Sequence, residues 1–352
     1  MKKGIRGFSL AGLVCILLCT ALTLGVGAAG GAQTRPSGDV ASRQLIPGGI
    51  PFGVKFQTDG VLVVGFCESG ELGGNKNPAR EAGLRPRDVV THVNGEAIES
   101  AEHLSERITA SGGAAVEIGY TRGGKPSTVT LTPIPDGAGG FRTGLYVRDS
   151  GAGIGTVTFI IPESRAFAGL GHGICDTETG ELMPLHRGQV TPVTISGVHR
   201  GAAGAPGELR GYFGASREGT LLGNTPCGVW GIYRQIPDNL PTETCGILPR
   251  KEVREGEVSI LCTLTSGERC AYSAAISAID RDAKGSKCFT VRITDEALLE
   301  ETGGIVQGMS GSPILQDGKL VGAITHVLIN NPTVGYGIFI ENMLAEMGDL
   351  AG

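Results

Sequence analysis

The stretch GMSGSP, from Gly308 to Pro313, contains the serine best placed for chemistry. A serine hydroxyl becomes a nucleophile only beside a base and beside hydrogen-bond donors for the oxyanion that its attack creates. Glycines around Ser310 let the backbone turn so that the amides of Gly308 and Ser310 can point at that oxygen. We therefore predict Ser310 as a nucleophile and these two amides as its oxyanion hole. Ser312 is the rival, disfavoured because a proline follows it, and an ordinary turn in a glycine-rich chain is the alternative.

A base must come from one of the six histidines. His172 lies in FAGLGHGICD, where the flanking glycines permit an unusual backbone and a close approach, so it is the predicted general base. The alternative is a turn histidine whose ring bonds to the backbone. His326 ends the strand predicted after the serine and is predicted to face the substrate in its pocket.

A carboxylate would complete such a site by fixing the tautomer of the imidazole. Asp295, in VRITDEALLEETGG, is the candidate that precedes Ser310 most closely. It could equally begin a short helix, where the helix dipole favours a carboxylate. Asp176, Asp280 and Asp282 are rival acids.

Composition sets the class of protein that must position these groups. The chain has 352 residues, of which 59 are glycine, more than twice the usual share of about 7%. Hydrophobic residues make up 40% and charged residues 18%, a balance that excludes a disordered chain, a collagen and a polytopic membrane protein. The net charge of −5 gives no reason to expect a nucleic-acid partner. We expect roughly two domains rich in turns.

The cysteines indicate no metal site. Cys15 and Cys19 lie in an apolar N-terminal run, and the other seven form no CxxC pair and fit no zinc spacing. Since HExxH is also absent, a zinc metallopeptidase site is excluded. We expect no metal and no other cofactor. The spacing assigns no disulfide, and small buried thiols are the simpler interpretation.

The N-terminal sequence predicts an export segment. Three basic residues within the first six positions precede an uncharged apolar run from Phe8 to Ala29, long enough to span a bilayer. We predict an anchor over residues 1–30 with the rest of the chain outside the cytoplasm, and small residues at 28–32 leave cleavage open. Residues 31–45 form a linker open to proteolysis.

Residues 46–135 are predicted as a separate domain of short strands, a helix from Ser100 to Ile108 and a hairpin. The stretch NPAREAGLRPRDVVTHVNGEAI, from Asn77 to Ile98, resembles the core of PDZ domains, which bind peptides as an added strand. The resemblance implies a glycine-rich loop that takes a peptide terminus and a groove beside a helix. The peptide-binding residues predicted on this basis are Gly49, Ile50, Phe52, Gly53 and His103.

Residues 136–352 contain short apolar runs separated by turn residues, a pattern that is typical of a β-barrel or sandwich. After Ser310, the strand PILQ, the turn at Asp317 and Gly318 and the strand KLVGAITH resemble the corresponding part of trypsin-like proteases. We therefore expect a mainly β chain with an N-terminal anchor, a PDZ-like domain and a trypsin-like double β-barrel.

The order of anchor, PDZ-like module, GLGHGICD and GMSGSPI resembles the stage IV sporulation protein B (SpoIVB) peptidase family. The resemblance implies a serine endopeptidase with a triad of His172, Asp295 and Ser310. It implies export from the forespore into the space between the two membranes around it. It also implies self-cleavage near the N-terminus and cleavage of a membrane-bound regulator of an intramembrane metalloprotease, a step that controls processing of a sigma-factor precursor.

Two other classes of function stay open at this point. The chain could be an inactive membrane scaffold in which the PDZ-like domain does the binding. It could instead be a quality-control protease similar to the HtrA type, although that type has its PDZ domain behind the protease.

Overall fold

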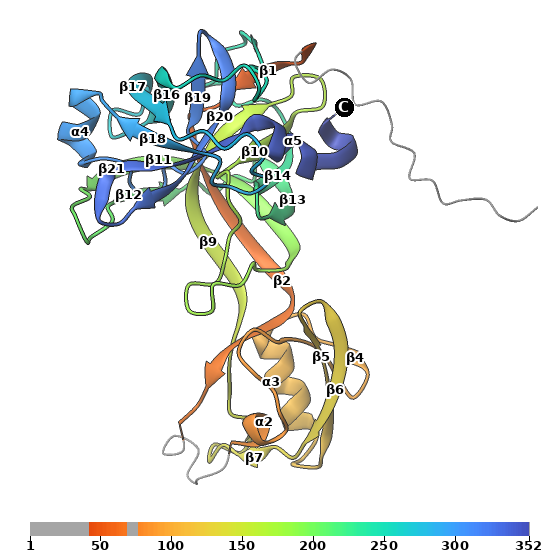
Figure 1. Cartoon of the computed structure of the whole chain (residues 1–352). Coiled ribbons are helices and arrows are strands. Elements are labelled where there is room, and N and C mark those ends of the chain that lie inside the picture. The colour runs from red at the N-terminus through yellow and green to blue at the C-terminus, as the bar shows by residue number, and fades with distance from the viewer. Residues whose placement is uncertain (1–41, 69–76, 352) are drawn as a thin grey trace, which may run out of the picture. The chain divides into compact units, whose positions relative to one another are not determined.

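The computed structural model describes residues 42–68 and 77–351, which are mainly β-structure (Figure 1). The predicted anchor, residues 1–30, and most of the predicted linker, residues 31–45, lie outside the described residues. Within the described ranges, every helix is too short or too polar to cross a membrane.

The first barrel is a ring of antiparallel strands that pair in the order β2, β9, β10, β14, β13, β11 and back to β2. These strands are β2 (Pro51–Phe66), β9 (Leu145–Ile160), β10 (Ala166–Gly169), β11 (Leu185–His199), β13 (Gly219–Thr225) and β14 (Gly228–Tyr233). Three further strands extend the sheet: β1 (Gln44–Pro47) beside β9, β15 (Cys245–Gly246) beside β1, and β12 (Glu208–Phe213) beside β11.

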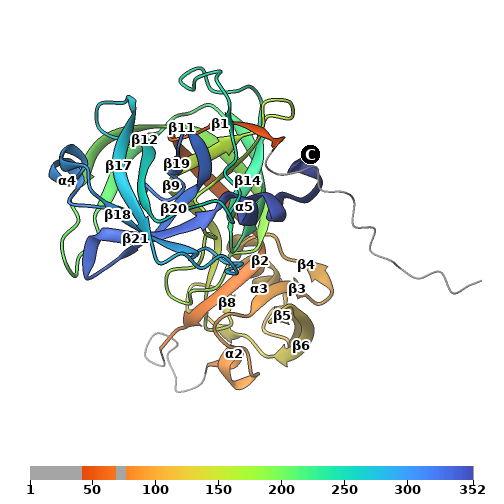
Figure 2. The same cartoon turned by 45° about the horizontal axis from the view of Figure 1, so that its top comes forward.

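The second barrel is closed, with strand order β16, β17, β18, β21, β20 and β19. All of these strands except β16 are labelled in Figure 2. Its elements are β16 (Gly256–Thr263), β17 (Arg269–Ser277), β18 (Phe289–Ile293), α4 (Glu296–Thr302), β19 (Pro313–Gln316), β20 (Lys319–Leu328), β21 (Asn331–Phe339), α5 (Ile340–Met347) and the 3-10 turn η2 (Gly348–Ala351). Asp317 and Gly318 join β19 to β20 with φ of 52° and 74°, the left-handed pair that a tight hairpin turn requires. The predicted hairpin and the predicted β-barrels are confirmed.

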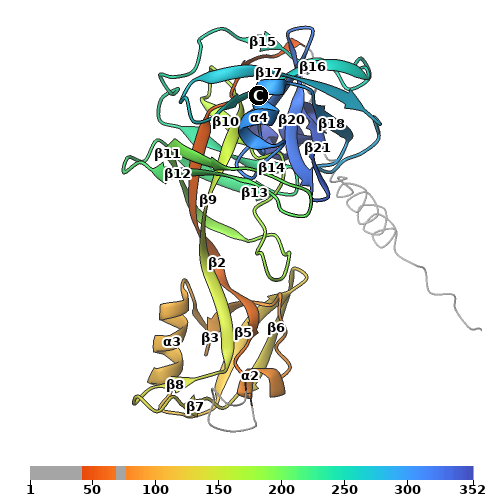
Figure 3. The ribbon, with the colours of Figure 1, turned by 90° about the vertical axis from the view of Figure 1, so that its left-hand side faces the viewer.

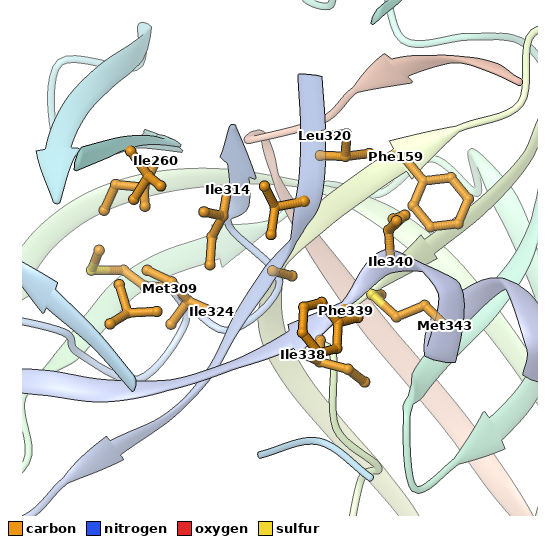
Figure 4. Packing of buried hydrophobic residues seen from close by; sticks show 14 of the residues in the cluster. Phe159, Ile260, Met309, Ile314, Leu320, Ile324, Ile338, Phe339, Ile340 and Met343 are labelled. Carbon is orange, nitrogen blue, oxygen red and sulfur yellow. The ribbon is translucent and has the colours of Figure 1, made fainter. Parts of the chain in front are cut away.

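One hydrophobic cluster joins the two barrels. Phe159 of β9 belongs to the same fully buried cluster as Ile314 of β19 and Phe339 of β21 (Figure 4). Alternation along the strands produces it, because inward residues are apolar and outward residues are exposed, as in β18. The barrels are therefore packed as one body around a shared core.

The PDZ-like part has a core of its own. Its elements are the end of β2, α2 (Pro78–Glu81), β3 (Val89–Val93), β4 (Glu96–Ala97), α3 (Ala101–Ala110), β5 (Val116–Arg122), β6 (Lys125–Leu131), β7 (Ile134–Pro135), β8 (Phe141–Arg142) and the start of β9 (Figure 3). Leu104 and Ile108 of α3 are buried against Val90 and Ile118 of the sheet. The side chain of Ser100 accepts a hydrogen bond from the amide of His103, so α3 begins at the serine, as predicted.

The structure differs from the predicted division at residues 45 and 135. β2 and β9 are long paired strands that run from the first barrel into the PDZ-like part. The first half of β2 lies in the barrel, where Val54 pairs with Val190 of β11 and with Gly153 of β9. Residues 51–58 of β2 therefore belong to the barrel, because they pair with β11 and with the barrel part of β9.

Gly322 tests how closely β20 and β21 must approach. A Cβ at this position would lie 1.7 Å from the carbonyl oxygen of Ile338, so Gly322→Ala forces the strands apart. We expect it to lower the free energy of unfolding by about 1–3 kcal/mol or more. Thermal unfolding of the full chain, followed by circular dichroism, measures the loss.

Gly153→Ala is the matched control, because a Cβ on this strand glycine meets no atom within 4 Å. Its unfolding temperature should stay at the wild-type value. Equal stability of the two variants would show that β20 and β21 are not packed as described.

Candidate active site

The loop that carries Ser310 is fixed by its buried neighbour and by two glycines. Met309 is fully buried in the shared core (Figure 4). Gly308 and Gly311 have φ of 97° and 95°, a conformation that residues with a Cβ adopt only with strain. A Cβ on Gly311 would also lie 2.0 Å from the carbonyl oxygen of Thr156. The glycines of GMSGSP are therefore required by the backbone path.

Strand β9 of the first barrel holds this loop of the second barrel. The amide of Thr156 donates to the Ser310 carbonyl at 2.9 Å, and its Oγ1 donates to the Gly308 carbonyl at 2.7 Å. Thr158 donates through Oγ1 to the Gly311 carbonyl at 2.8 Å. Both threonines are almost completely buried. We call these three hydrogen bonds the β9 clamp.

The clamp occupies the carbonyls of the loop and leaves two amides free. Within residues 42–68 and 77–351, neither the amide of Gly308 nor that of Ser310 donates a hydrogen bond to the protein. These are the two donors predicted for an oxyanion hole, and their positions in the loop suit that role.

The hydroxyl of Ser310 donates to the carbonyl of Thr325 on β20 at 2.7 Å. Ser310 is half-buried, whereas Ser312 is fully buried and its hydroxyl donates to the Met309 carbonyl at 2.6 Å. A substrate can therefore reach Ser310 but not the rival serine.

His172 lies beside the same segment of β20. A Cβ on the preceding Gly171 would be 2.8 Å from Cγ2 of Thr325, and the ring of His172 is 4.8 Å from the ring of His326 between centroids. The structure thus brings His172, Ser310 and His326 to one place. Among the described hydrogen bonds none joins His172 to Ser310, and Nδ1 of His172 pairs with the Gly173 carbonyl at 2.9 Å.

Burial keeps both imidazoles neutral. Burial lowers the pKa of His172, and the hydrogen bond to Gly173 raises it by a smaller amount. Burial, His172 and Lys287 together lower the pKa of His326 to about 4. Nδ1 of His326 is buried without a hydrogen-bond partner, so this ring offers a free polar atom next to His172. Its predicted role as a pocket wall stays a prediction.

Asp295 caps a helix. Its carboxylate accepts from the amide of Leu298 at 3.1 Å and from that of Ser273 at 3.2 Å, at the start of α4, which confirms the helix-start interpretation. Asp295 follows one end of β18, a strand that rises about 3.3 Å per residue, and Phe289 lies at the other end. Phe289 pairs with Gly337 of β21, which pairs in turn with Ile324 of β20, next to Thr325. No described hydrogen bond links Asp295 to His172, and its orienting role stays a prediction.

The rival acids have other partners. Asp176 is buried and pairs with Arg148, and it also accepts from the amide of Thr179 at 2.8 Å. Asp280 is exposed and accepts from the amide of Asp282 at 3.0 Å. No hydrogen bond described for these acids reaches the imidazole.

The predicted peptide-binding loop is wrong in its position. Ile50 and Phe52 are 4% and 1% exposed in the core of the first barrel, where a peptide cannot reach them. A Cβ on Gly49 would press on Leu261, and one on Gly53 would press on Phe213. These residues precede the PDZ-like part in sequence but pair with the barrel strands.

The groove of the PDZ-like part lies elsewhere. A hollow of about 240 Å³ is lined by α3, through Leu104, Ser105 and Ile108, and by residues 141–145 with Val147 and Cys67. His103 lies on α3 but not among the residues that line the groove. The glycine-rich stretch DGAGGFRTG, from Asp136 to Gly144, follows the predicted end of the PDZ-like domain at residue 135, yet its last four residues line this groove.

The seven cysteines from Cys67 to Cys288 are free thiols, and Cys227, Cys262 and Cys288 are buried. No group of three or more His, Cys, Asp or Glu side chains in the described part of the chain could hold a metal ion.

The pKa values of His172 and His326 can be measured directly. We expect the pKa of His172 below 6.5 and that of His326 at about 4, because burial disfavours the charged ring. His172, the predicted base, is then neutral at pH 7 and becomes protonated only as the pH falls through its lowered pKa. Histidine NMR titration of the full chain carrying Ser310→Ala measures both values, with His172→Ala to assign the signal. A His172 pKa at or above 6.5 would contradict the described burial.

Two family models match parts of this chain. The model of the SpoIVB peptidase S55 family matches residues 139–344, and that of the PDZ domain matches residues 76–122. No curated protein matches this chain.

Several solved structures are similar. The Rv3671c protease of M. tuberculosis in its active form is 16% identical with a TM-score of 0.33, over 56% of this chain and 75% of that one. The MamO protease domain of Magnetospirillum magneticum is 11% identical with a TM-score of 0.30, over 55% and 88%. The PDZ domain of the SdrC-like protein of Listeria monocytogenes is 24% identical with a TM-score of 0.22, over 25% and 87%. Because the S55 match spans more than half of the sequence, this chain belongs to the SpoIVB peptidase family and is a serine endopeptidase with a PDZ domain.

Proposed function

We propose that Ser310 is the nucleophile of this peptidase and His172 its general base. Ser310 Oγ attacks the scissile carbonyl carbon while its proton passes to Nε2 of His172. The amides of Gly308 and Ser310 receive the oxyanion. His172 then gives the proton to the leaving amine as the carbon–nitrogen bond breaks, and water repeats the cycle to release the acid. The observation that carries this proposal is the loop itself, in which the β9 clamp leaves these two amides unpaired.

The hydroxyl must change partner before it attacks. In the described conformation Ser310 donates to the Thr325 carbonyl, which cannot act as a base at pH 7. A rotation about the Cα–Cβ bond moves Oγ between staggered positions and is a small change in energy. We infer that the substrate, by occupying the oxyanion hole, favours the position from which Oγ reaches His172.

We propose a signalling role for this endopeptidase. The chain is exported, is held at the membrane by residues 1–30 and cuts itself within residues 31–45. It then cuts a membrane-bound regulator of an intramembrane metalloprotease between the forespore and mother-cell membranes. Membership of the SpoIVB family and the charge pattern of the N-terminus support this role. Because β1 begins at Gln44, a cut before that residue leaves both barrels intact.

The groove between α3 and residues 141–147 is the feature we propose for target recognition. A peptide that adds beside a strand is held by main-chain hydrogen bonds, while the groove takes its side chains. Binding at this groove raises the concentration of the target at the protease.

Ser310 can be tested against its neighbour. We expect Ser310→Ala to abolish fluorophosphonate labelling and self-shortening, with turnover reduced about 10⁶-fold, because the nucleophile is gone. Ser312→Ala is the control, because that hydroxyl is fully buried and only bonds to Met309. Intact mass over time and labelling of the full chain measure both.

Labelling that persists in Ser310→Ala would assign the nucleophile to another residue. A wild type that neither labels nor shortens would favour the scaffold function. Rapid digestion of unfolded casein at many sites would favour a quality-control protease.

The β9 clamp makes a separate prediction. Thr156→Val removes the donor to the buried Gly308 carbonyl and leaves that oxygen unpaired, which costs about 1–3 kcal/mol. We expect kcat to fall about 10- to 100-fold as the oxyanion donors lose their position. Thr156→Ser keeps the hydroxyl and should keep most of the activity. Equal rates for Val and Ser, from steady-state kinetics on a peptide, would show that the clamp does not position the loop.

A further inference from the structure

The described conformation fixes the tautomer of His172 without a carboxylate. Nδ1 of His172 is 2.9 Å from the carbonyl oxygen of Gly173. A carbonyl oxygen can only accept a hydrogen bond, so Nδ1 carries the hydrogen and Nε2 keeps its lone pair. This is the tautomer that a base acting through Nε2 needs.

The Gly173 carbonyl is itself held in place. Gly173 C=O and the amide of Ile174 belong to one planar trans peptide group and point in opposite directions. The side chain of Asn224 accepts from this Ile174 amide at 2.8 Å. A bond on one side of the peptide therefore aims the carbonyl on its other side at the imidazole.

Asn224 holds the segment with both ends of its amide. Its Nδ2 donates to the Ile174 carbonyl at 2.9 Å and to the Met183 carbonyl at 2.9 Å. Aspartate has no donor to replace these bonds, so an amide is required for all three.

The packing around this peptide admits little movement. A Cβ on Gly173 would lie 2.2 Å from Cδ1 of Leu182 and 2.8 Å from the Thr225 carbonyl oxygen. The turn after β13 also packs on the backbone before the histidine, since a Cβ on Gly228 would lie 2.7 Å from the Gly169 carbonyl. Asn224, at the end of β13, is thus built into the wall of the site.

We propose that Asn224 is a positioning residue that fixes the ring of His172 through the Gly173–Ile174 peptide. The proposal rests on the proposed role of His172 as the general base. As Ser310 attacks, its proton moves to Nε2 and the Nδ1 hydrogen stays where it is, donated to a neutral carbonyl. The imidazolium gains less from this partner than from a carboxylate. Burial lowers the pKa of His172, and the hydrogen bond to Gly173 raises it.

The test compares the imidazole signals of ¹⁵N-histidine-labelled full-length protein carrying Ser310→Ala, with and without Asn224→Ala. We expect one tautomer with hydrogen on Nδ1 when Asn224 is present and a mixture when it is absent. In the active protein, Asn224→Ala should lower kcat up to about 100-fold with KM unchanged, because Asn224 positions the base and does not touch the substrate.

Asn94→Ala is the matched control. Asn94 also holds a backbone amide, that of Glu117 at 2.8 Å, but lies in the PDZ-like part. It should leave the His172 signal and kcat unchanged. Asp295→Asn should also leave the Nδ1 signal unchanged, whereas loss of that signal would assign the orienting role to Asp295 and overturn the proposal.

Asn224→Asp gives a second measurement, the pH profile of kcat/KM, whose position does not depend on how much of the protein folds. It keeps an acceptor for Ile174 but brings a negative charge within one peptide group of the ring, where His326 and, beyond it, Lys287 are the titratable neighbours. The charge favours the protonated imidazole, so the pKa of His172 rises and the acid limb of kcat/KM moves to higher pH. An acid limb at the wild-type position would overturn the proposal.

The two proposals fail separately. If Ser310→Ala and His172→Ala are inactive while the Asn224 variants match Asn94→Ala, the protease mechanism stands and Asn224 has no positioning role. If the wild type does not react with the fluorophosphonate, the mechanism falls, and the NMR signal alone decides what orients His172.

Discussion

Three hydrogen bonds from β9 to the Ser310 loop are the constraint on which the site depends. They join the barrels where the chemistry takes place, and both threonines that donate them are buried. A buried carbonyl that loses its donor is costly, so the loop has one favourable path. That path leaves the amides of Gly308 and Ser310 free. The proposed oxyanion donors are therefore available only when both barrels are folded and packed on their shared core.

The position of His172, the proposed base, also depends on the packing of the two barrels. Ser310, the proposed nucleophile, comes from the second barrel and His172 from the first, and they meet at Thr325 and His326 of β20. The polar groups that hold them are neutral: backbone carbonyls, threonine hydroxyls and the amide of Asn224. In a half-buried site, neutral partners avoid the cost of desolvating a charge. Burial keeps the imidazole uncharged at neutral pH, as the proposed general base must be, although the Gly173 hydrogen bond raises its pKa.

Local features were predictable, and features that depend on distant pairing were not. The glycines around Ser310, the turn at Asp317 and the capped helix at Ser100 are read from adjacent residues. The partners of β2 are not, and for that reason residues 49–53 were placed in a peptide groove although they lie in the barrel. Asn224 gives no sequence signal at all, because its role arises only when β13 packs beside the histidine loop.

A crystal structure of the wild-type fluorophosphonate adduct tests the central claim most directly, because the phosphonyl oxygen takes the place of the oxyanion. We expect phosphorus bonded to Ser310 and that oxygen about 2.7–3.1 Å from the amides of Gly308 and Ser310. The bonds from Thr156 and Thr158 should be retained. An oxygen that points away from these amides, or a loop released from β9, would contradict the account.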